Sequence, residues 1–292
     1  MPDSAPTAID RRLTLQRERL LAEIRGYESC AVAFSGGVDS AVVAQAAFLA
    51  LGSRAVAVTA VSDSLATGEL DAAIALARQI GIAHRVLPTR EFENPAYLRN
   101  EPDRCYHCKT ELYTRLEAWL PELNVAVMAN GANLDDRGDW RPGMQAAAEH
   151  RVRSPLLDCE LTKDDVRALA AHWGLSVWDK PAMPCLSSRV AYGQQVTPER
   201  VAMIDRAEQL LRAHGIRETR VRYHEGDLAR IEVPLAELSR LAEPSLRAAL
   251  VEELSRLGFR FVTLDLAGFR SGSLNAALPE VAVPRDALRL RE

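Results

Sequence analysis

The sequence lacks the features that take a chain to a membrane or to nucleic acid. No apolar run is long enough to span a bilayer, and no apolar segment follows Arg11 and Arg12 as it would in a signal peptide. The formal net charge is −4 and no basic run is present, so no strong field attracts nucleic acid or anionic lipid. We therefore expect a cytoplasmic protein that binds neither membrane nor nucleic acid.

The cysteines are odd in number, five in all, and give no disulfide framework. We expect reduced thiols, with Cys30 and Cys159, which belong to no motif, packing as small apolar residues. Internal repeats and low-complexity tracts are also lacking. What is present is an ordinary globular composition, 48% apolar and 26% charged, in a chain of 292 residues that is long enough for two domains.

The segment from residue 31 to residue 51 organises the chain. A short apolar run at 31–34 leads into the string S-G-G-V-D-S at 35–40, and an apolar-rich helical pattern extends over 38–51. This order predicts a strand, a tight loop and a helix. The loop is not a Walker A motif, because it lacks both the spacing and the lysine of G-x-x-x-x-G-K-[ST].

The residues of this loop suit a phosphate ligand. Gly36 and Gly37 can adopt positive φ and let a ligand approach the backbone, and the N–H groups that begin the next helix favour an anion. Ser35 and Ser40 add hydroxyl donors, and Asp39 adds a carboxylate suited to Mg²⁺. The string resembles the pyrophosphate loop (PP loop) of the ATP pyrophosphatase superfamily, whose members release pyrophosphate and leave AMP on a substrate oxygen. A plain structural turn is the alternative.

Strand and helix patterns alternate after this point, which predicts a parallel sheet covered on both faces, with ligands beyond the carboxyl ends of its strands. A stretch rich in Pro, Ser and Gly at 179–193 predicts a domain boundary. We expect a doubly wound α/β domain over 1–183, loose at its first residues, and a smaller α/β domain over 184–292. The expected strands are 31–34, 55–61, 82–87, 125–128, 219–224, 229–233 and 259–266, and the expected helices are 9–26, 38–51, 68–80, 105–120, 162–174, 197–214 and 246–257.

Three cysteines are candidates for a metal site: the C-x-x-C pair Cys105 and Cys108, and Cys185. Three thiolates can hold a 4Fe-4S cluster and leave one iron open to an extra sulfide. A zinc site would need a fourth ligand, such as His107 or another cysteine, and a redox dithiol is a further interpretation. The spacing alone does not separate a cluster, zinc and plain structural cysteines.

Polar residues also follow the expected strand at 125–128, in the string N-G-A-N-L-D-D-R at 130–137. They lie at a carboxyl end of the sheet, beside the glycine loop. We expect Asn133 to read the ribose or base of a nucleotide, and Asp135 or Asp136 to share Mg²⁺. An ordinary Asn/Gly/Asp turn is the alternative.

The second half of the chain places Arg220, Arg222 and His224 on one face of an expected strand, with Val221 and Tyr223 on the other. Two guanidiniums on one face suit a phosphate or carboxylate through bidentate hydrogen bonds. A solvated strand face explains such charges equally well.

With these motifs in view, nearly the whole chain resembles the LarE family. LarE proteins help to make the nickel-pincer nucleotide cofactor of lactate racemase, and they use ATP to convert two carboxylates of a pyridinium mononucleotide into thiocarboxylates. The resemblance rests on nine strings in order: S-G-G-V-D-S at 35–40, R-C-Y-H-C-K at 104–109, N-G-A-N-L-D-D at 130–136, R-P-G at 141–143, S-P-L at 154–156, W-D-K-P at 178–181, P-C-L-S-S-R at 184–189, R-V-R at 220–222 and L-D-L-A-G-F-R-S-G-S at 264–273.

The resemblance implies Mg²⁺ and ATP as cofactors, a pyridinium mononucleotide as substrate, a sulfur donor protein or free sulfide as partner, and a homo-oligomer. It makes Arg220 and Arg222 candidates for the substrate phosphate. The residues for which it implies a catalytic role are Cys185, Asp39, Ser188 and Arg189.

The cysteines decide which form of the family the chain resembles. In one form, a lone cysteine matching Cys185 gives up its own sulfur and becomes dehydroalanine. This chain also has Cys105 and Cys108, and so resembles the three-cysteine form, which is thought to hold a 4Fe-4S cluster and to pass on a cluster-bound sulfide. Two rivals remain: a PP-loop tRNA thiolase with a three-cysteine cluster, which would need a basic surface, and a nucleotide sensor that has lost its chemistry.

Overall fold

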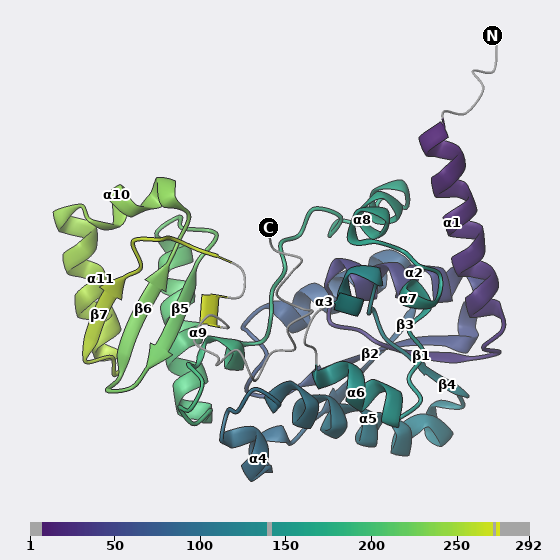
Figure 1. The fold of residues 1–292 in the computed structure, drawn as a ribbon, viewed down its shortest axis with the longest axis horizontal. Coiled ribbons are helices and arrows are strands. Elements are labelled where there is room, and N and C mark those ends of the chain that lie inside the picture. The colour runs from purple at the N-terminus through teal and green to yellow at the C-terminus, as the bar shows by residue number, and fades with distance from the viewer. Residues whose placement is uncertain (1–7, 139–141, 271–272, 275–292) are drawn as a thin grey trace, which may run out of the picture.

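The structure is a computed structural model that describes residues 8–138, 142–270 and 273–274. Two sheets, each with its own helices, lie at opposite ends of the molecule (Figure 1). Arg141 of the R-P-G string, residues 271–272 of the last string and the N-terminal residues expected to be loose, up to residue 7, lie outside the described residues.

The larger sheet is parallel throughout, with the strand order β3-β2-β1-β4. The strand β1, one of the two inner strands, is an apolar run whose residues from Cys30 to Val32 are fully buried, because helices cover both faces of the sheet. Its carboxyl end leads into the PP loop, as expected. The strands are β1 (Cys30–Ala33), β2 (Ala55–Val61), β3 (Ala83–Pro88) and β4 (Val127–Ala129).

Two separate apolar cores lie on the two faces of this sheet. The larger core contains Cys30 and Val32 of β1 together with residues of α1, α2, α3, α7 and α8. The other core contains Ala31 of β1 together with residues of α5 and α6. The sheet is therefore doubly wound. These helices are α1 (Ala8–Arg25), α2 (Val38–Leu51), α3 (Glu69–Ile80), α5 (Arg104–Leu123), α6 (Pro142–Glu149), α7 (Pro155–Asp158) and α8 (Lys163–His172).

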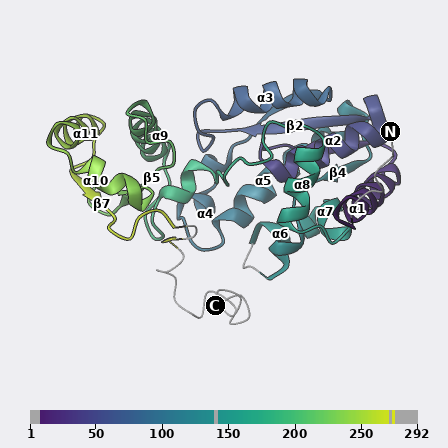
Figure 2. The same cartoon turned by 90° about the horizontal axis from the view of Figure 1, so that it is seen from above.

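The smaller sheet has the order β5-β6-β7, with an antiparallel pair β5–β6 and a parallel pair β6–β7. Alternate residues such as Val221, Tyr223 and Ile231 pack against α9 and α11, so one face of this sheet is apolar. Figure 2 shows α9 and α11 side by side at this end of the molecule. The elements are α9 (Pro198–Ala213), β5 (Arg220–His224), β6 (Leu228–Glu232), α10 (Leu238–Leu241), α11 (Pro244–Arg256) and β7 (Phe261–Leu264).

The expected α/β class and the order of its main elements are thus confirmed. A capping box begins α8 within the expected helix 162–174, since Asp165 N–H donates to Thr162 Oγ1 over 3.3 Å and Thr162 N–H donates to Asp165 Oδ2 over 3.1 Å. Short elements were not expected: α4 (Pro95–Leu98), α6, α7 and α10, and the 3₁₀ turns Gly52–Arg54, Glu91–Glu93, Leu134–Gly138, Leu186–Arg189 and Leu235–Glu237.

The two halves share apolar contacts across the connection. Tyr97 of α4 is fully buried and belongs to the core of the smaller sheet, as does Leu186. Thr67, before α3, donates its N–H and hydroxyl to Asp205 of α9 over 3.3 and 2.6 Å. The predicted boundary between 183 and 184 lies in a connecting segment that is exposed over residues 181–185, and it stays a prediction.

Candidate functional site

The PP loop joins β1 to α2, and its backbone N–H groups at the start of α2 are not covered by a capping side chain. Gly36 has φ +72°, and a Cβ there would lie 3.3 Å from the Cβ of Ala73 on α3, so a side chain is unfavourable on both counts. Gly37 is the N-cap of α2, and no side chain caps the helix. The first N–H groups of α2 therefore remain available to an anion.

The two serines of the loop hold its shape. Ser40 donates its hydroxyl to Gly37 O over 3.0 Å and accepts the N–H of Ser35 over 3.2 Å. Ser35 Oγ lies 3.2 Å from Ser40 Oγ and 3.4 Å from Gly37 N. Their hydroxyls are therefore already ordered at the mouth of the loop.

Asp39 is contacted by two residues from distant parts of the chain. Asn133 Nδ2 donates to Asp39 Oδ1 over 2.9 Å, and Lys163 Nζ lies 2.5 Å from Asp39 Oδ2. Lys163 is the first residue of α8, whereas Asn133 follows β4. The structure thus brings the expected residues Asp39 and Asn133 together, and adds a lysine that the sequence analysis did not single out.

The loop after β4 approaches α2 so closely that only glycine fits at position 131. A Cβ on Gly131 would lie 2.8 Å from Ser40 N and 3.0 Å from the Cβ of Asp39. Asp136 faces back into its own loop, where Asn133 N–H donates to Asp136 Oδ2 over 3.0 Å, and Asp136 does not line the cleft described next.

A cleft of about 770 Å³ opens in front of the PP loop and extends to the smaller sheet. Expected site residues that line it are Ser35, Gly37, Asp39, Ser188, Arg220 and Arg222. Its walls carry six cationic side chains, Arg104, Lys109, Lys163, Lys180, Arg220 and Arg222, against three acidic ones, Asp39, Glu69 and Glu218. This excess of positive charge suits a ligand with several phosphates or carboxylates.

Hydrogen bonds join the two segments that carry the cysteines. Arg104, next to Cys105, donates through Nη1 to Ser187 O over 2.8 Å, and Tyr97 Oη lies 2.6 Å from Ser187 Oγ. Asn100 Nδ2 donates to Val190 O over 3.1 Å. These buried contacts hold the start of α5 against the 3₁₀ turn that follows Cys185.

The three thiols belong to these two segments, with Cys105 and Cys108 on α5 and Cys185 before the 3₁₀ turn. Burial, and then the charge of Cys185, raise the pKa of the Cys108 thiol to about 12. Cys105 and Cys185 are exposed, Cys108 is half-buried, and all five cysteines of the chain are free. Within the described ranges, however, no group of three His, Cys, Asp or Glu side chains is arranged so that it could hold a metal ion. The thiols thus fit a cluster in donor type, but their arrangement among the described residues is not that of a metal site.

A turn tightened by Arg189 presents Cys185. Arg189 is fully buried, and its Nη1 donates to the carbonyl oxygens of Pro184 and of Cys185, the latter over 3.0 Å. Ser188 Oγ donates to the same Cys185 O over 2.7 Å. Of the two residues beside Cys185 for which a catalytic role was expected, Ser188 lines the cleft, whereas Arg189 lies behind it.

Arg220 and Arg222 do not form a solvated face, because both are buried. Arg222 pairs with Glu232, with Nη2 2.9 Å from Oε2, and its Nη1 donates to Ser188 O over 3.1 Å. Burial lowers the pKa of Arg220 to about 10, and its guanidinium lies 5.0 Å from the ring centroid of Phe269. Both arginines line the cleft while their other donors bind the protein.

Sequence reasoning missed the lysines of the cleft. Burial opposes the charge of Lys109, but Tyr113 and Cys108 outweigh it, so the pKa of this ammonium is raised. In the part of the chain that the structure describes, Lys109 has no acidic partner, whereas Lys180 pairs with Glu69 over 2.8 Å. The only sequence signal for Lys109 was its place in the R-C-Y-H-C-K string.

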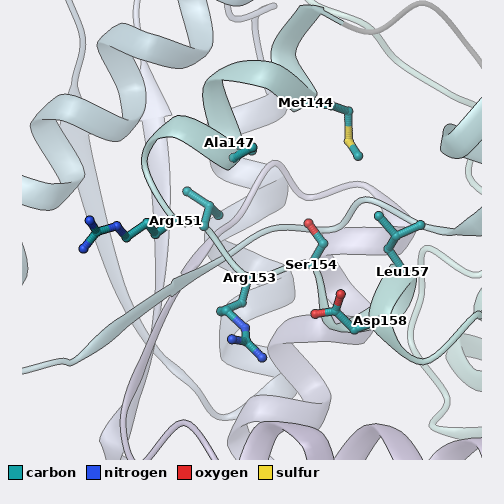
Figure 3. A pocket seen from close by; sticks show the side chains of 9 residues that line it. Met144, Ala147, Arg151, Arg153, Ser154, Leu157 and Asp158 are labelled. Atoms are coloured by element: carbon teal, nitrogen blue, oxygen red, sulfur yellow. The ribbon is translucent and has the colours of Figure 1, made fainter.

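A second hollow of about 480 Å³ lies away from these residues, between α6 and α7. Figure 3 shows Met144 and Ala147 above it, and Ser154, Leu157 and Asp158 beside it. None of the expected site residues lines this hollow. Among the described helices, none combines the length and apolarity needed to cross a membrane.

The fold and the loop define the class of protein. A parallel doubly wound sheet with S-G-G-V-D-S at the carboxyl end of its inner strand β1 is that of a PP-loop enzyme, and the family model described as NAD synthase matches residues 17–100. A tRNA-specific 2-thiouridylase of Xanthobacter autotrophicus is 33% identical over 51% of the chain and 48% of its own length.

Relatives of full length identify the family within this class. A pyridinium-3,5-bisthiocarboxylic acid mononucleotide synthase of Lactiplantibacillus plantarum is 37% identical over 91% of this chain and 96% of its own length. An uncharacterized protein of Synechocystis is 46% identical over 85% of the chain and 92% of its own length. The chain belongs to the LarE family.

Proposed function

We propose that this enzyme is an ATP-dependent sulfur transferase. It adenylylates the carboxylates of pyridinium-3,5-biscarboxylic acid mononucleotide and replaces AMP with sulfur, which gives thiocarboxylates. The observation that carries the proposal is the junction of Arg104 with Ser187, because it brings both cysteine-bearing segments to the cleft into which the PP loop opens. The full-length similarity to a synthase of the bisthiocarboxylic acid product supports the same substrate.

The first step activates a poor electrophile. A carboxylate oxygen of the substrate attacks the α-phosphorus of ATP, and pyrophosphate leaves. The N–H groups at the start of α2 and the nearby Lys163 would neutralise the leaving pyrophosphate, and Asp39 would hold Mg²⁺, which would stabilise the same charge. Asn133 orients Asp39 through its 2.9 Å hydrogen bond, and in this proposal it would also read the ribose or base of the nucleotide. Asp136 shapes this loop through Asn133 N–H.

The second step places sulfur on the activated carbon. A sulfur nucleophile attacks the acyl carbon and AMP departs with the bridging oxygen, so each turnover exchanges one carboxyl oxygen for sulfur. Cys185 would take part from a turn that is held by Ser188 and Arg189, and whose residues Pro184 and Ser188 line the cleft. Arg220 and Arg222 line the far end of the cleft, where the phosphate of the substrate would bind.

Cys105, Cys108 and Cys185 would hold a 4Fe-4S cluster with one open iron. Such a group would supply a bound sulfide, so that no cysteine is consumed. The support is that the three cysteines are free, that Arg104 joins the two segments that carry them, and that Arg104 and Lys109 would offset the charges of thiolates. Aerobic purification followed by anaerobic reconstitution with iron and sulfide should give a broad absorption in the blue, and Cys105→Ala should abolish it. A colourless protein with stoichiometric zinc would contradict this assignment.

The remaining expectations belong to the same proposal. Sulfur would come from a donor protein or free sulfide, the chain would form a homo-oligomer, and the enzyme would work in the cytoplasm. Residues 1–183 would form the adenylylating domain, and residues 184–292 would bind the substrate and carry oligomer contacts. Size-exclusion chromatography with light scattering tests the oligomer.

Two variants separate the two steps of the reaction. Asp39→Ala should stop the ATP-dependent release of pyrophosphate, because it removes the metal carboxylate. Cys185→Ala should leave pyrophosphate release intact and block the transfer of sulfur. Loss of both activities in Cys185→Ala would contradict the assignment. A tRNA thiolase is the alternative outcome: binding of tRNA that weakens steeply with salt would favour it over the mononucleotide substrate.

A further inference from the structure

Glu208 of α9 is a carboxylate that the proposed reaction does not use, and it is fully buried. Its Oε1 accepts Arg189 Nε over 3.0 Å, and its Oε2 accepts Arg189 Nη2 over 3.3 Å. Arg189 is itself 0% exposed. A buried pair of this kind is costly to desolvate and strongly destabilising to break, so its retention in the core calls for a reason beyond stability.

The partner of this carboxylate reaches the Cys185 turn. Arg189 Nη1 donates to Cys185 O over 3.0 Å and also contacts Pro184 O. Because Glu208 holds two other nitrogens of the same planar guanidinium, it fixes the plane in which Nη1 meets these carbonyls. The direction of the turn, and hence of the Cys185 side chain, depends on a residue of α9.

The same carboxylate also holds the strand that carries the arginines of the cleft. Val221 N–H donates to Glu208 Oε1 over 3.2 Å, and Val221 lies between Arg220 and Arg222 on β5. One buried side chain therefore ties together the turn that presents Cys185 and the strand that faces the other end of the cleft. A second arginine, Arg212, pairs with Glu208 from the same helix over 3.0 Å, and among the described residues it donates no hydrogen bond to either of these elements.

We propose that Glu208 is a positioning residue for sulfur transfer, which sets the place of Cys185 relative to Arg220 and Arg222. The sulfur step itself rests on the proposed function above. A substrate that is held at its phosphate by β5 and attacked at its carboxyl carbon near Cys185 needs this spacing constant. A small displacement of a reacting group is enough to slow a reaction strongly.

The test compares Glu208→Gln with Arg212→Gln in the full-length chain. Glutamine keeps the shape of Glu208 but replaces one of its two acceptor oxygens with an NH₂ group, which cannot accept a hydrogen bond from Arg189. Arg212→Gln removes the other ion pair of Glu208 and leaves Arg189 in place. If Glu208→Gln does not fold, the double variant Arg189→Met with Glu208→Gln replaces it, because removing both charges avoids an unpaired one in the core.

Hydrogen exchange gives a readout that does not depend on activity. In Glu208→Gln, exchange should rise about tenfold in peptides 184–190 and 220–224 and stay unchanged in the peptide of the PP loop, because the opening is local. Arg212→Gln should match the wild type in all three peptides. In Glu208→Gln, kcat for thiocarboxylate formation should also fall about tenfold, with pyrophosphate release and the KM for ATP unchanged.

Three results of the exchange experiment would overturn the proposal: wild-type exchange of Glu208→Gln in peptides 184–190 and 220–224, faster exchange across the whole molecule, or the same pattern in Arg212→Gln. Unchanged thiocarboxylate formation in Glu208→Gln would overturn it as well. If the wild type forms no thiocarboxylate, the proposed function fails. The hydrogen-exchange experiment then still decides whether Glu208 positions the turn that carries Cys185.

Discussion

A single methyl group at position 131 should push the loop after β4 away from the start of α2. Gly131 lies where the loop after β4 crosses the start of α2, and a Cβ there would be 2.8 Å from Ser40 N. Ordinary contact begins at 3.4 Å, so in Gly131→Ala the loop or the helix must retreat by about 0.6 Å. The neighbouring atoms belong mostly to backbone and cannot rotate away. The displacement therefore falls on the hydrogen bond between Asn133 and Asp39.

The size of the effect follows from this geometry. Forcing one extra carbon into a packed region costs about 1–3 kcal/mol. A loss of this size lowers Tm by about 2–10 °C in a chain of this length. A misplacement of about 1 Å at a reacting group can cost about a hundredfold in rate, so a shift of roughly half that size predicts about a tenfold loss.

The assay is ATP-dependent release of pyrophosphate, measured together with thermal unfolding. Gly26→Ala serves as the matched control, because it follows α1, far from the PP loop, and its Cβ would meet only Glu23 O at 3.3 Å. We expect Gly131→Ala to lose about tenfold in kcat/KM for ATP, and Gly26→Ala to stay within about twofold of the wild type. Normal pyrophosphate release by Gly131→Ala would refute the argument that this crossing positions Asp39.

Three further changes have defined outcomes. Lys109→Met should raise the KM for ATP or for the nucleotide substrate about tenfold, because an unpaired ammonium leaves the cleft; unchanged KM values for both would contradict its role in binding anions. Burial raises the pKa of Cys30 to about 12, so the thiol stays protonated in the folded protein but ionises in the unfolded chain above about pH 9. Between pH 8 and about pH 10.5, the free energy of unfolding in urea should therefore fall by about 2 kcal/mol more in the wild type than in Cys30→Ala. Tyr97→Phe should lower the free energy of unfolding by about 1 kcal/mol, because it removes the hydrogen bond to Ser187, and it should retain pyrophosphate release. A loss of pyrophosphate release in this variant would contradict a role confined to the segments that carry the thiols.

Local patterns in the sequence predicted most of the larger sheet. The apolar run before the PP loop is buried on both faces, and α2 begins at Val38 and ends at Leu51, as expected from its composition. The smaller sheet followed from alternation, because Val221 and Tyr223 face its core. Short helices such as α4 and α6 were missed, since tertiary contacts rather than a long periodic pattern stabilise them.

The sequence predicted only some of the residues of the candidate site. Motif strings pointed to Asp39, Asn133 and the cysteines, and the structure brings Asn133 within 2.9 Å of Asp39. Gly131 was hidden because its requirement comes from another element, the start of α2. The buried pair of Arg189 and Glu208 was hidden for the same reason, since a charge that looks solvated in sequence can be paired across 19 positions in the fold.

The central claim is that this cleft exchanges a carboxyl oxygen for sulfur. The most direct measurement is mass spectrometry of the nucleotide after anaerobic incubation of the reconstituted enzyme with ATP, Mg²⁺, sulfide and pyridinium-3,5-biscarboxylic acid mononucleotide. We expect one and then two oxygens to be replaced by sulfur, with AMP and pyrophosphate formed in step. An unchanged nucleotide, or an adenylylated one that never gains sulfur, would contradict the claim.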